Sequence, residues 1–347
     1  MKKMTILTAA TSALALSAGI ASAQDEAESM EVGSTTSSFY GFVLAGFSDQ
    51  DVNQSGSTVG SDGGNGPSRF GFLGETVLAD GMTGGVQIEY GVDNSSAASG
   101  GQNSGVNLRQ ANAYLTGDFG RIEVGSQDNS MYEWTTSVTD LFLTSAFAQA
   151  RASDVIFRQD GAIFYTTPDL NGLQLRAGGT LQRGDSTPGN ESSGFDSYTV
   201  SAKYNFQDLY ASLSYISVDQ SPDDATSFGA SVSYDYGAGV IAAAMTDNDH
   251  LTDFGGTNVQ VNDWYGSGNG KPYEIVGTYT GVPNWTFKLA YADSDQDGGS
   301  SSSVAAEAQY NFASNVAVAV GATNPDKNFG GSNSSEDILA TALYVAF

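Results

Sequence analysis

The side chains of this chain that could take part in chemistry are mostly carboxylates, and three of them share one unusual stretch. Asp128, Glu133 and Asp140 lie within residues 126–154, among tryptophan, phenylalanine and leucine side chains. A connection of this length inside a compact domain is usually a lid or a binding segment. Because a large exposed apolar patch is an interaction surface, we predict that residues 126–154 fold inward against a wall. A helical insertion packed on the outside is the alternative.

A second group of oxygen ligands lies in the sequence DSDQDG, residues 293–298. Asp293, Asp295 and Asp297 occupy positions 1, 3 and 5 of a calcium loop, and a glycine follows at position 6. Position 12 is Val304 where an EF-hand has a bidentate glutamate, which excludes an intact EF-hand. A looser calcium site is a weak hypothesis and a solvated acidic loop is the default. No other cofactor is expected.

Catalysis is not indicated by the residues that usually perform it. A hydrolase usually needs a histidine base next to a nucleophile. The single histidine, His250, stands beside Asp247, Asp249 and Asp253, but the next serine is Ser267. We therefore expect no enzymatic activity.

The first 23 residues have the pattern of a secretory signal peptide. Lys2 and Lys3 precede an apolar run, and Ala21 to Ala23 form a cleavage pattern, so the mature chain would begin at Gln24. No later segment approaches the ~18 consecutive apolar residues that a transmembrane helix needs. Insertion of residues 24–347 into a membrane would therefore require a β-barrel.

Composition limits the partners. Without Lys2 and Lys3 the mature chain has 11 basic residues against 39 acidic ones, a net charge of −28. This charge argues against a nucleic acid as partner and favours cations. The chain has no cysteine, so stability must come from a large sheet and not from disulfides.

The elements that would position these residues are β-strands. In many segments apolar and polar residues alternate, as in residues 68–78 and 198–205, which is the period of a strand with two different faces. Short turns alternate with long polar loops between the strands, and aromatic residues cluster near strand ends. The pattern predicts an all-β fold, a transmembrane antiparallel β-barrel of 16 strands. Lipid requires such a sheet to be closed, and we expect residues 126–154, the third long loop, to narrow its wide lumen.

Four sequences carry a resemblance to a known family. SRFGFLGET, LRQANAYLTGDFGRIEVGSQDN, FRQDGAIFYTTPDLNGLQL and the terminal Phe347 resemble the general bacterial porins of Gram-negative outer membranes, from about Phe39 to the end. The resemblance implies a homotrimer of 16-stranded barrels. It also implies a third loop that folds into each lumen and carries carboxylates opposite basic residues on the wall.

The resemblance also implies a set of pore residues. Arg69 and Arg158 match wall arginine positions, while Ser126 and Phe42 stand where the family often has a further arginine and a lysine. Arg109 shares its strand face with apolar residues, so the sequence does not determine whether its side chain faces the lumen. We expect opposite charges to face each other across water, with arginines on the wall and carboxylates on the loop. The predicted constriction set is Arg69, Arg158, Arg176, Asp128, Glu133 and Asp140.

These features predict an outer-membrane porin that forms a water-filled channel. Small hydrophilic solutes and ions would diffuse through it passively, and the excess of acid predicts a preference for cations. The expected partners are two further copies of the chain, outer-membrane lipid and lipopolysaccharide. A substrate-selective porin and a plugged structural or adhesive barrel are the alternatives, and the sequence does not decide between a general and a selective channel.

Overall fold

The structure is a computed structural model of the 347-residue chain. It describes residues 32–50, 58–60, 68–92, 105–148, 156–181, 194–219, 223–250, 259–261, 269–293, 302–325 and 338–347. The predicted signal peptide, together with Asp295 and Asp297 of the calcium hypothesis, lies outside these residues.

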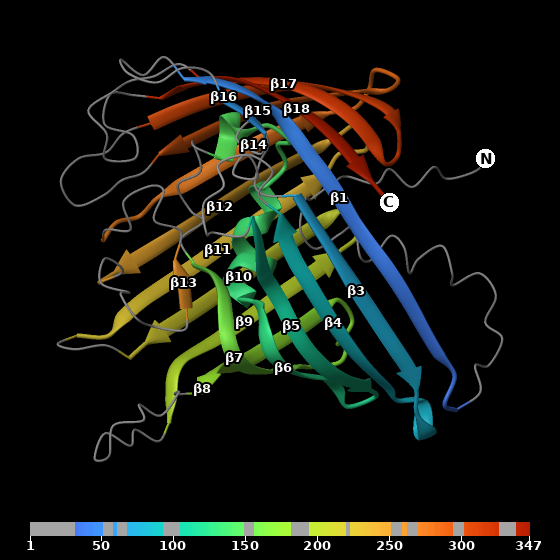
Figure 1. The fold of residues 1–347 in the computed structure, drawn as a ribbon. Coiled ribbons are helices and arrows are strands. Elements are labelled where there is room, and N and C mark those ends of the chain that lie inside the picture. Colours follow the sequence, from blue (N-terminus) through green and yellow to red (C-terminus); the bar gives the residue numbers. More distant parts are fainter. Residues whose placement is uncertain are drawn as a thin grey trace.

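Long antiparallel strands make up most of the described chain (Figure 1). The first half of the sheet contains β1 (Thr35–Gln50), β3 (Ser68–Val77), β4 (Thr83–Val92), β5 (Val106–Gly117), β6 (Gly120–Asp128), β7 (Ile156–Thr166), β8 (Leu173–Leu181) and β9 (Phe195–Phe206). The second half contains β10 (Leu209–Val218), β11 (Ala225–Asp235), β12 (Val240–Asp249), β14 (Tyr273–Tyr279), β15 (Trp285–Asp293), β16 (Ser302–Ala313), β17 (Val316–Pro325) and β18 (Ile338–Ala346).

Each of these sixteen strands pairs with its neighbours in the sequence, and the last pairs with the first. β1 pairs with β3 along one edge and with β18 along the other, from Phe42 opposite Ala346 to Gln50 opposite Ile338. Two further strands of three residues, β2 (Thr58–Gly60) and β13 (Val259–Val261), pair with β1 and β7. The predicted sixteen-stranded closed barrel is confirmed, and the backbone of Phe347 completes the closure through hydrogen bonds with Gly41.

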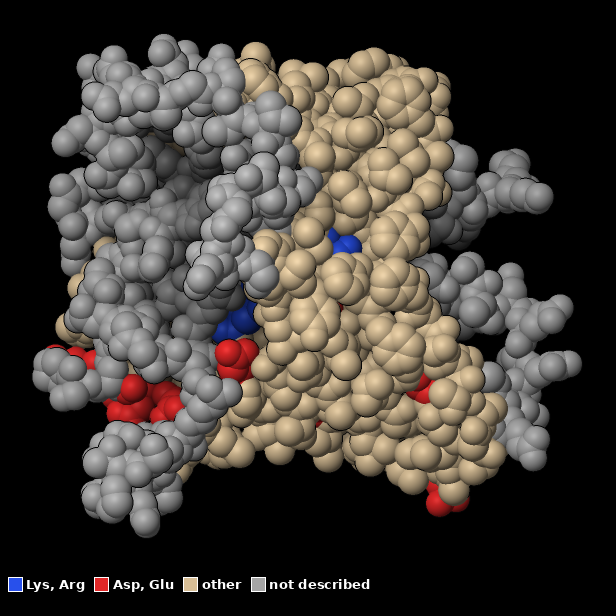
Figure 2. Space-filling model, viewed as in Figure 1, with Lys and Arg blue, Asp and Glu red and all other residues tan. Residues whose placement is uncertain are grey.

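The two faces of the sheet differ as the alternation predicts. In β9, Val200 is 54% exposed, whereas its neighbour Thr199 is fully buried. The outward residues are apolar or aromatic, and ring contacts gather beside the short turns, as where Trp285 packs edge-on against Tyr310 at 5.1 Å between ring centroids. The described part of the face in Figure 2 is accordingly mostly uncharged, with acidic side chains mainly in its lower part. Among the described residues no helix is long and apolar enough to cross a membrane.

The third long loop contains three short helical elements. They are η4 (Met131–Thr135), η5 (Thr136–Thr139) and α2 (Ser145–Ala148). Asn129 donates to Thr199 on β9 at 3.1 Å, and Thr135 forms a 2.7 Å hydrogen bond with Ser214 on β10. Both wall residues are buried members of the inward face. The described part of the loop therefore lies inside the barrel, as the green helical segments of Figure 1 show.

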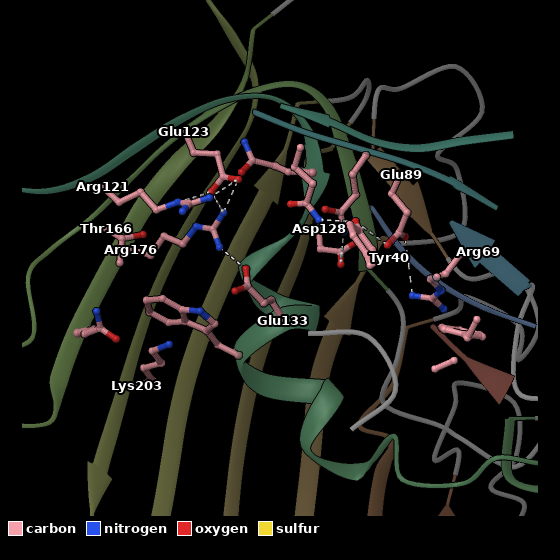
Figure 3. A pocket seen from close by; sticks show the side chains of 18 of the residues that line it. Tyr40, Arg69, Glu89, Arg121, Glu123, Asp128, Glu133, Thr166, Arg176 and Lys203 are labelled. Atoms are coloured by element: carbon pink, nitrogen blue, oxygen red, sulfur yellow. Dashed lines mark hydrogen bonds and ion pairs between the residues drawn. The ribbon is translucent and has the colours of Figure 1, made fainter. Parts of the chain in front are cut away.

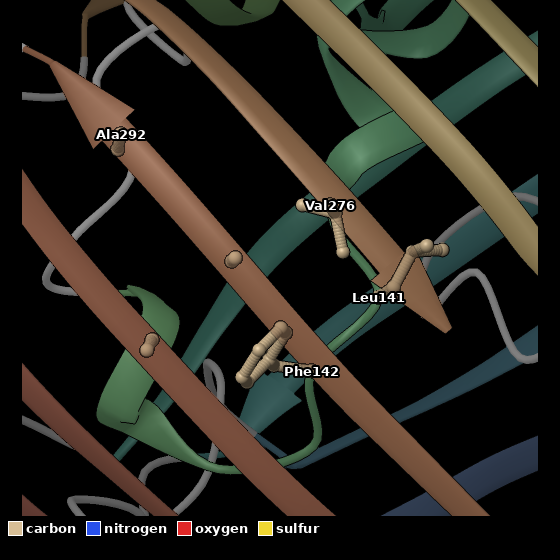
Figure 4. Packing of buried hydrophobic residues seen from close by; sticks show 6 residues of the cluster. Leu141, Phe142, Val276 and Ala292 are labelled. Atoms are coloured by element: carbon tan, nitrogen blue, oxygen red, sulfur yellow. The ribbon is translucent and has the colours of Figure 1, made fainter. Parts of the chain in front are cut away.

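The apolar core of the molecule lies between this loop and one part of the barrel wall. Leu141 and Phe142 belong to one buried apolar cluster with Val276 on β14 and Ala292 on β15, and Leu141 lies beside Val276 (Figure 4). Leu143 packs beside Leu44 on β1, and Ala146 packs against Ile338 and Ala340 on β18. A row of inward alanines on β15 to β18 leaves room for the loop. Burial of this apolar surface is the main favourable contribution that holds the loop in place.

Candidate functional site

A cavity of about 530 Å³ lies inside the barrel beside the third loop (Figure 3). Its lining is rich in charged and amide side chains, supplied mainly by β1, β3 to β9 and the start of the loop. The lining residues are Tyr40, Gly41, Phe42, Arg69, Gln87, Glu89, Gln110, Arg121, Glu123, Gln127, Asp128, Glu133, Trp134, Thr166, Gln174, Arg176, Lys203, Asn315, Tyr344, Ala346 and Phe347.

The first charged group of the cavity surrounds Glu89 on β4. Arg109 donates from Nε to Glu89 Oε1 at 2.7 Å, and Arg69 Nη1 lies 3.8 Å from the same oxygen. Tyr40 donates its hydroxyl to the other carboxylate oxygen at 3.2 Å, and Gln87 donates to Tyr40. One carboxylate thus serves two guanidinium groups, and the buried Arg69 Nε and Arg109 Nη2 have no hydrogen-bond partner among the described residues.

The direction of Arg109 depends on a β-bulge. In the pairing of β4 with β5, Glu89 stands opposite Gln110 while Tyr90 stands opposite Leu108, so Arg109 is one extra residue in its strand. An extra residue turns two successive side chains to the same side. Arg109 and Gln110 are accordingly both buried on the inner face. The alternation of the sequence could not determine this direction.

The second group lies where β6 passes into the third loop. Asp128 Oδ1 is 3.1 Å from Nε of Arg158 on β7, and Asp128 Oδ2 accepts a 3.0 Å hydrogen bond from Gln110. Since Gln110 belongs to β5, the start of the loop is fixed to strands on both sides of β6. Arg158 adjoins Asp128 but does not itself line the cavity.

The third group joins β6, β8 and the loop. Arg121 makes two contacts with Glu123, at 3.1 and 3.2 Å, and Arg176 Nη2 lies 3.6 Å from Glu123 Oε2. Arg176 also donates to Glu133 on the loop and, at 3.0 Å, to Gln127. Figure 3 shows this group on the opposite side of the cavity view from Arg69 and Glu89.

Glu133 is the loop carboxylate held most directly by the wall. Burial would raise its pKa, but the nearby charges of Arg176, Lys203 and Arg121 outweigh burial and hold the pKa of Glu133 below its usual range. Glu133 therefore stays ionised, and paired with Arg176, to a lower pH than an isolated glutamate would.

All four cations that line the cavity lie over aromatic rings. Distances from the cationic group to the ring centroid are 4.8 Å for Arg69 over Phe42, 3.6 Å for Arg121 over Tyr114, 4.5 Å for Arg176 over Phe164 and 4.3 Å for Lys203 over Trp134. Stacking on a ring face is attractive and restricts the cation to one position. The positive charges are therefore fixed in place along the wall.

The cavity differs in charge from the chain as a whole. Its lining residues and their ion-pair partners include six cations, Arg69, Arg109, Arg121, Arg158, Arg176 and Lys203, against four carboxylates, Glu89, Glu123, Asp128 and Glu133. This local excess of two positive charges contrasts with the net charge of −26 for the full sequence.

The predicted constriction residues are brought together in part. Arg69, Arg176, Asp128 and Glu133 line the cavity. Asp140 does not line the cavity; it is a buried residue of the loop and accepts a 2.9 Å hydrogen bond from the Tyr132 hydroxyl.

The sequence predicts that loop carboxylates and wall arginines face each other across water. Instead, Asp128 and Glu133 are in direct contact with Arg158 and Arg176.

Sequence reasoning missed several cavity residues. Arg121 and Glu123 are two residues apart on β6 and therefore share a face, and Glu89 alternates with the outward Ile88 and Tyr90 on β4. The two-residue period of the strands alone would place these three side chains on the inner face. Lys203 shares the inward parity of Thr199 and Ser201 on β9, so the alternation gives its direction, but not its contact with the loop residue Trp134.

Two buried carboxylates of the opposite wall hold the loop. Glu307 on β16 accepts hydrogen bonds from the backbone of Leu143 at 3.0 Å and of Thr144 at 2.8 Å, and from the Thr144 hydroxyl at 2.7 Å. Lys288 on β15 balances its charge at 2.7 Å. Thr139 donates to the second carboxylate, Glu274 on β14.

Two glycines leave space for the loop. A Cβ atom on Gly321 of β17 would lie 2.2 Å from the Thr144 hydroxyl oxygen, and one on Gly229 of β11 would lie 2.4 Å from the Met131 sulfur. Any larger side chain at these positions would collide with the loop. Glycine is therefore part of how the wall positions the loop.

Two other predicted features lie away from the cavity. His250 follows the last residue of β12, Asp249, and its side chain is 47% exposed. Asp293 ends β15, where it accepts a hydrogen bond from Tyr291 at 3.2 Å. No group of three metal-ligating side chains occurs in the part of the chain that the structure describes, so the calcium hypothesis stays a prediction.

Fold and cavity together define a transmembrane β-barrel with a charged interior. The family model described as Gram-negative porin matches residues 10–329, and the chain belongs to that family. Porins are outer-membrane barrels. The sequence resemblance to porins is thereby confirmed.

Individual relatives are distant. A monosaccharide porin of a Halomonas species is 28% identical over 234 residues, which cover 63% of this chain and 60% of the relative. The matched region thus spans less than two thirds of that relative's length.

Two solved structures have the same fold. The anion-selective porin from Comamonas acidovorans has a TM-score of 0.69 at 16% identity, covering 90% of this chain and 100% of the other. Salmonella typhi OmpF in complex with daunomycin has a TM-score of 0.71 at 19% identity, covering 90% of this chain and 97% of the other.

Proposed function

We propose that this chain forms a water-filled channel through which small hydrophilic solutes and ions diffuse passively across the outer membrane. The observation that carries the proposal is a charged cavity inside a closed barrel, bounded on one side by a loop that is fixed to the wall. A barrel of this size is too wide for wall side chains alone to fill. The loop would therefore set the diameter of the passage.

Selection in such a channel would depend on charge and on hydration. The cavity presents fixed guanidinium, ammonium and carboxylate groups, which orient water and dipolar solutes. An apolar solute would have to displace this ordered water without replacing its hydrogen bonds. The channel would therefore admit sugars, small amides and ions and exclude apolar solutes of equal size.

The ionic preference would come from charges outside the cavity. The cavity itself has an excess of two cations, so a preference for cations would have to arise from the acidic residues elsewhere in the chain. Exposed charges are screened beyond about 10 Å at 0.1 M salt. We therefore propose a weak cation preference that is largest in dilute salt and declines as salt is raised.

The test is single-channel current of the purified protein in a planar bilayer under a salt gradient. A reversal potential on the cation side that falls towards zero between about 0.01 M and 1 M salt is the expected result. A potential on the anion side at every concentration would show that the cavity cations control selectivity. Absence of any current would favour the plugged barrel.

The proposed assembly is a homotrimer in outer-membrane lipid and lipopolysaccharide, matured by removal of residues 1–23. Current that closes in three equal steps would support the trimer. Mass spectrometry of the outer-membrane protein should give an N-terminus at Gln24. A mature chain that retained Lys2 and Lys3 would contradict the proposed cleavage.

A substrate-selective porin is the second candidate. Leu141, Phe142 and Leu143 give the third loop an apolar segment, and the Halomonas relative is named a monosaccharide porin. Because these loop residues are buried against the wall, they do not themselves form an open binding surface. Saturable uptake of one monosaccharide in liposomes would favour the selective channel, and uptake that stays proportional to concentration would favour the general one.

A further inference from the structure

Lys203 differs from the other cations that line the cavity. Its side chain comes from β9, and its ammonium nitrogen lies 4.3 Å from the centroid of the Trp134 ring. Arg69, Arg121 and Arg176 each form an ion pair with a carboxylate. Lys203 has no hydrogen bond or ion pair with any other residue that the structure describes.

The carboxylates whose charges act on Lys203 are those of Glu133 and Asp169, and each makes a direct contact with another group. Glu123 receives both contacts from Arg121 and lies 3.6 Å from Arg176, which also donates to Glu133. Asp169, in the short turn between β7 and β8, accepts a 2.6 Å hydrogen bond from the backbone of Gly172. Since these carboxylates make their direct contacts with other groups, the charge of Lys203 lacks a direct counterion.

The ammonium group is held in place before any ligand arrives. Trp134 is 3% exposed, and its backbone carbonyl accepts a hydrogen bond from Tyr210 on β10. The indole is thus a rigid support for Lys203, which lowers the entropy lost when the ammonium group binds. Polar groups for further contacts lie beside it, because Gln174 stands opposite Lys203 in the pairing of β8 with β9, and both Gln174 and Thr166 line the cavity.

We propose that Lys203, supported by Trp134, is a binding subsite for small hydroxylated carboxylates in the lumen. The carboxylate would accept hydrogen bonds from the ammonium group, and the hydroxyls would contact Gln174 and Thr166. The subsite is an addition to the proposed channel and relies on it for access. It makes such solutes bind during passage, which a channel that acts by size alone would not do.

The subsite lies nearer to the short-turn end of the barrel than to the long-loop end. Lys203 precedes the short turn between β9 and β10, which begins after Phe206. Thr166 and Gln174 flank the neighbouring short turn between β7 and β8. A blocking solute should therefore act more strongly from the short-turn end of the barrel than from the long-loop end.

The first test measures block of the ion current in a planar bilayer by gluconate, with sorbitol as an uncharged probe of similar size. Gluconate should block at a lower concentration than sorbitol and more strongly from the short-turn side. Lys203→Gln should raise the half-blocking concentration about tenfold, because a hydrogen bond to a charged group typically contributes about that factor to binding affinity. Lys271→Gln removes the same charge from an exposed position paired with Asp247, and it should leave the block unchanged.

Three results would overturn the subsite. They are equal block by gluconate and sorbitol, an unchanged block in Lys203→Gln, and an equal shift in both variants. The last result would mean that gluconate responds to total charge and not to this site.

A second test does not need an open channel. Trp134 fluorescence of the intact protein in detergent micelles should change on addition of gluconate, because an anion at Lys203 alters the field at the indole. Trp134→Phe should abolish the change and sorbitol should not cause it. Binding of gluconate by a protein that does not conduct would support the subsite and contradict the proposed channel. Conduction without this fluorescence change would contradict the subsite and leave the proposed channel standing.

Discussion

Two walls of the same barrel use their inward positions in opposite ways. On β3 to β9 these positions hold arginines, carboxylates and amides that border the cavity. On β14 to β18 many of them hold alanine, and the third loop packs there through Leu141, Phe142 and Ala146. On the first wall large polar side chains border the passage. On the second wall small side chains leave space in which the loop packs.

Charge is used differently on the two walls as well. Glu307 and Lys288 on the loop wall are buried and paired, and the carboxylate binds the loop backbone. Glu133 on the cavity side is 33% exposed although it also forms an ion pair. The buried pair of the loop wall therefore positions the loop, whereas Glu133 remains partly accessible beside cavity charges such as Arg176 that are themselves buried.

The largest expected effect tests this difference by removing one carboxylate from each side. Glu307→Ala should lower the free energy of unfolding by about 3–5 kcal/mol, because it leaves Lys288 buried without its counterion. Glu133→Ala should have a smaller effect, since its side chain is partly exposed. Guanidinium unfolding in lipid vesicles measures both.

The control for this prediction is the double variant Glu307→Leu with Lys288→Met. Removing both charges should recover much of the stability, because hydrophobic residues often replace a buried ion pair without loss. Equal destabilisation by Glu307→Ala and Glu133→Ala would remove the distinction between the two walls.

The next effect concerns the space left for the loop. Gly321→Val should destabilise the barrel by about 1–3 kcal/mol through overpacking and should push Thr144 toward the passage, lowering single-channel conductance. Gly277→Val on β14 is the matched control, since a Cβ atom there meets nothing within 4 Å. An unchanged conductance in Gly321→Val would show that the loop does not bound the passage at this point.

The sequence was sufficient for the barrel and for the direction of most strands. Alternation over β9 placed Thr199 and Ser201 inside, and both are buried. Closure follows from the physics of lipid and needs no contact information. Strand number followed from counting turns, because short turns and long loops alternate.

The site was less predictable, for reasons that particular residues show. Arg109 turns inward only because a bulge breaks the period of β5. Asp140 is a loop carboxylate like Glu133, yet it accepts a hydrogen bond from Tyr132 and does not line the cavity. Lys203 depends on a ring that is 69 positions earlier in the sequence, at Trp134. Contacts between a loop and a wall are not encoded in local periodicity.

A smaller effect is expected from removing one charge at the cavity. Arg176→Gln should shift the reversal potential toward cations, with a change in permeability ratio below about tenfold, or ~1.4 kcal/mol. The double variant Glu307→Leu with Lys288→Met removes a pair of charges that the loop covers, and it should leave selectivity unchanged. If the covered pair altered selectivity as much as Arg176→Gln, the loop wall would also border the passage.

The smallest effect concerns pH and the pairing of Glu133 with Arg176. Arg176 and its neighbours lower the pKa of Glu133 in the folded protein, so the ion pair contributes stability that is fully present above the unfolded pKa of about 4.3. That contribution is lost only as pH falls through the lower, folded pKa. In Arg176→Gln the pKa of Glu133 should rise, and Glu133 should titrate at a higher pH than in the wild type.

Many other carboxylates titrate in the same range, so the signal of Glu133 must be isolated by difference. The reversal potential of Arg176→Gln between about pH 5 and 4 should change more than that of the double variant Arg176→Gln with Glu133→Gln. In the background with Arg176 intact, Glu133→Gln should make a smaller difference to the pH dependence over this interval, because the lowered pKa of Glu133 moves its titration to lower pH. If both comparisons gave the same difference, Arg176 would not control Glu133, and the cavity wall would hold its charges no more firmly than an exposed surface does.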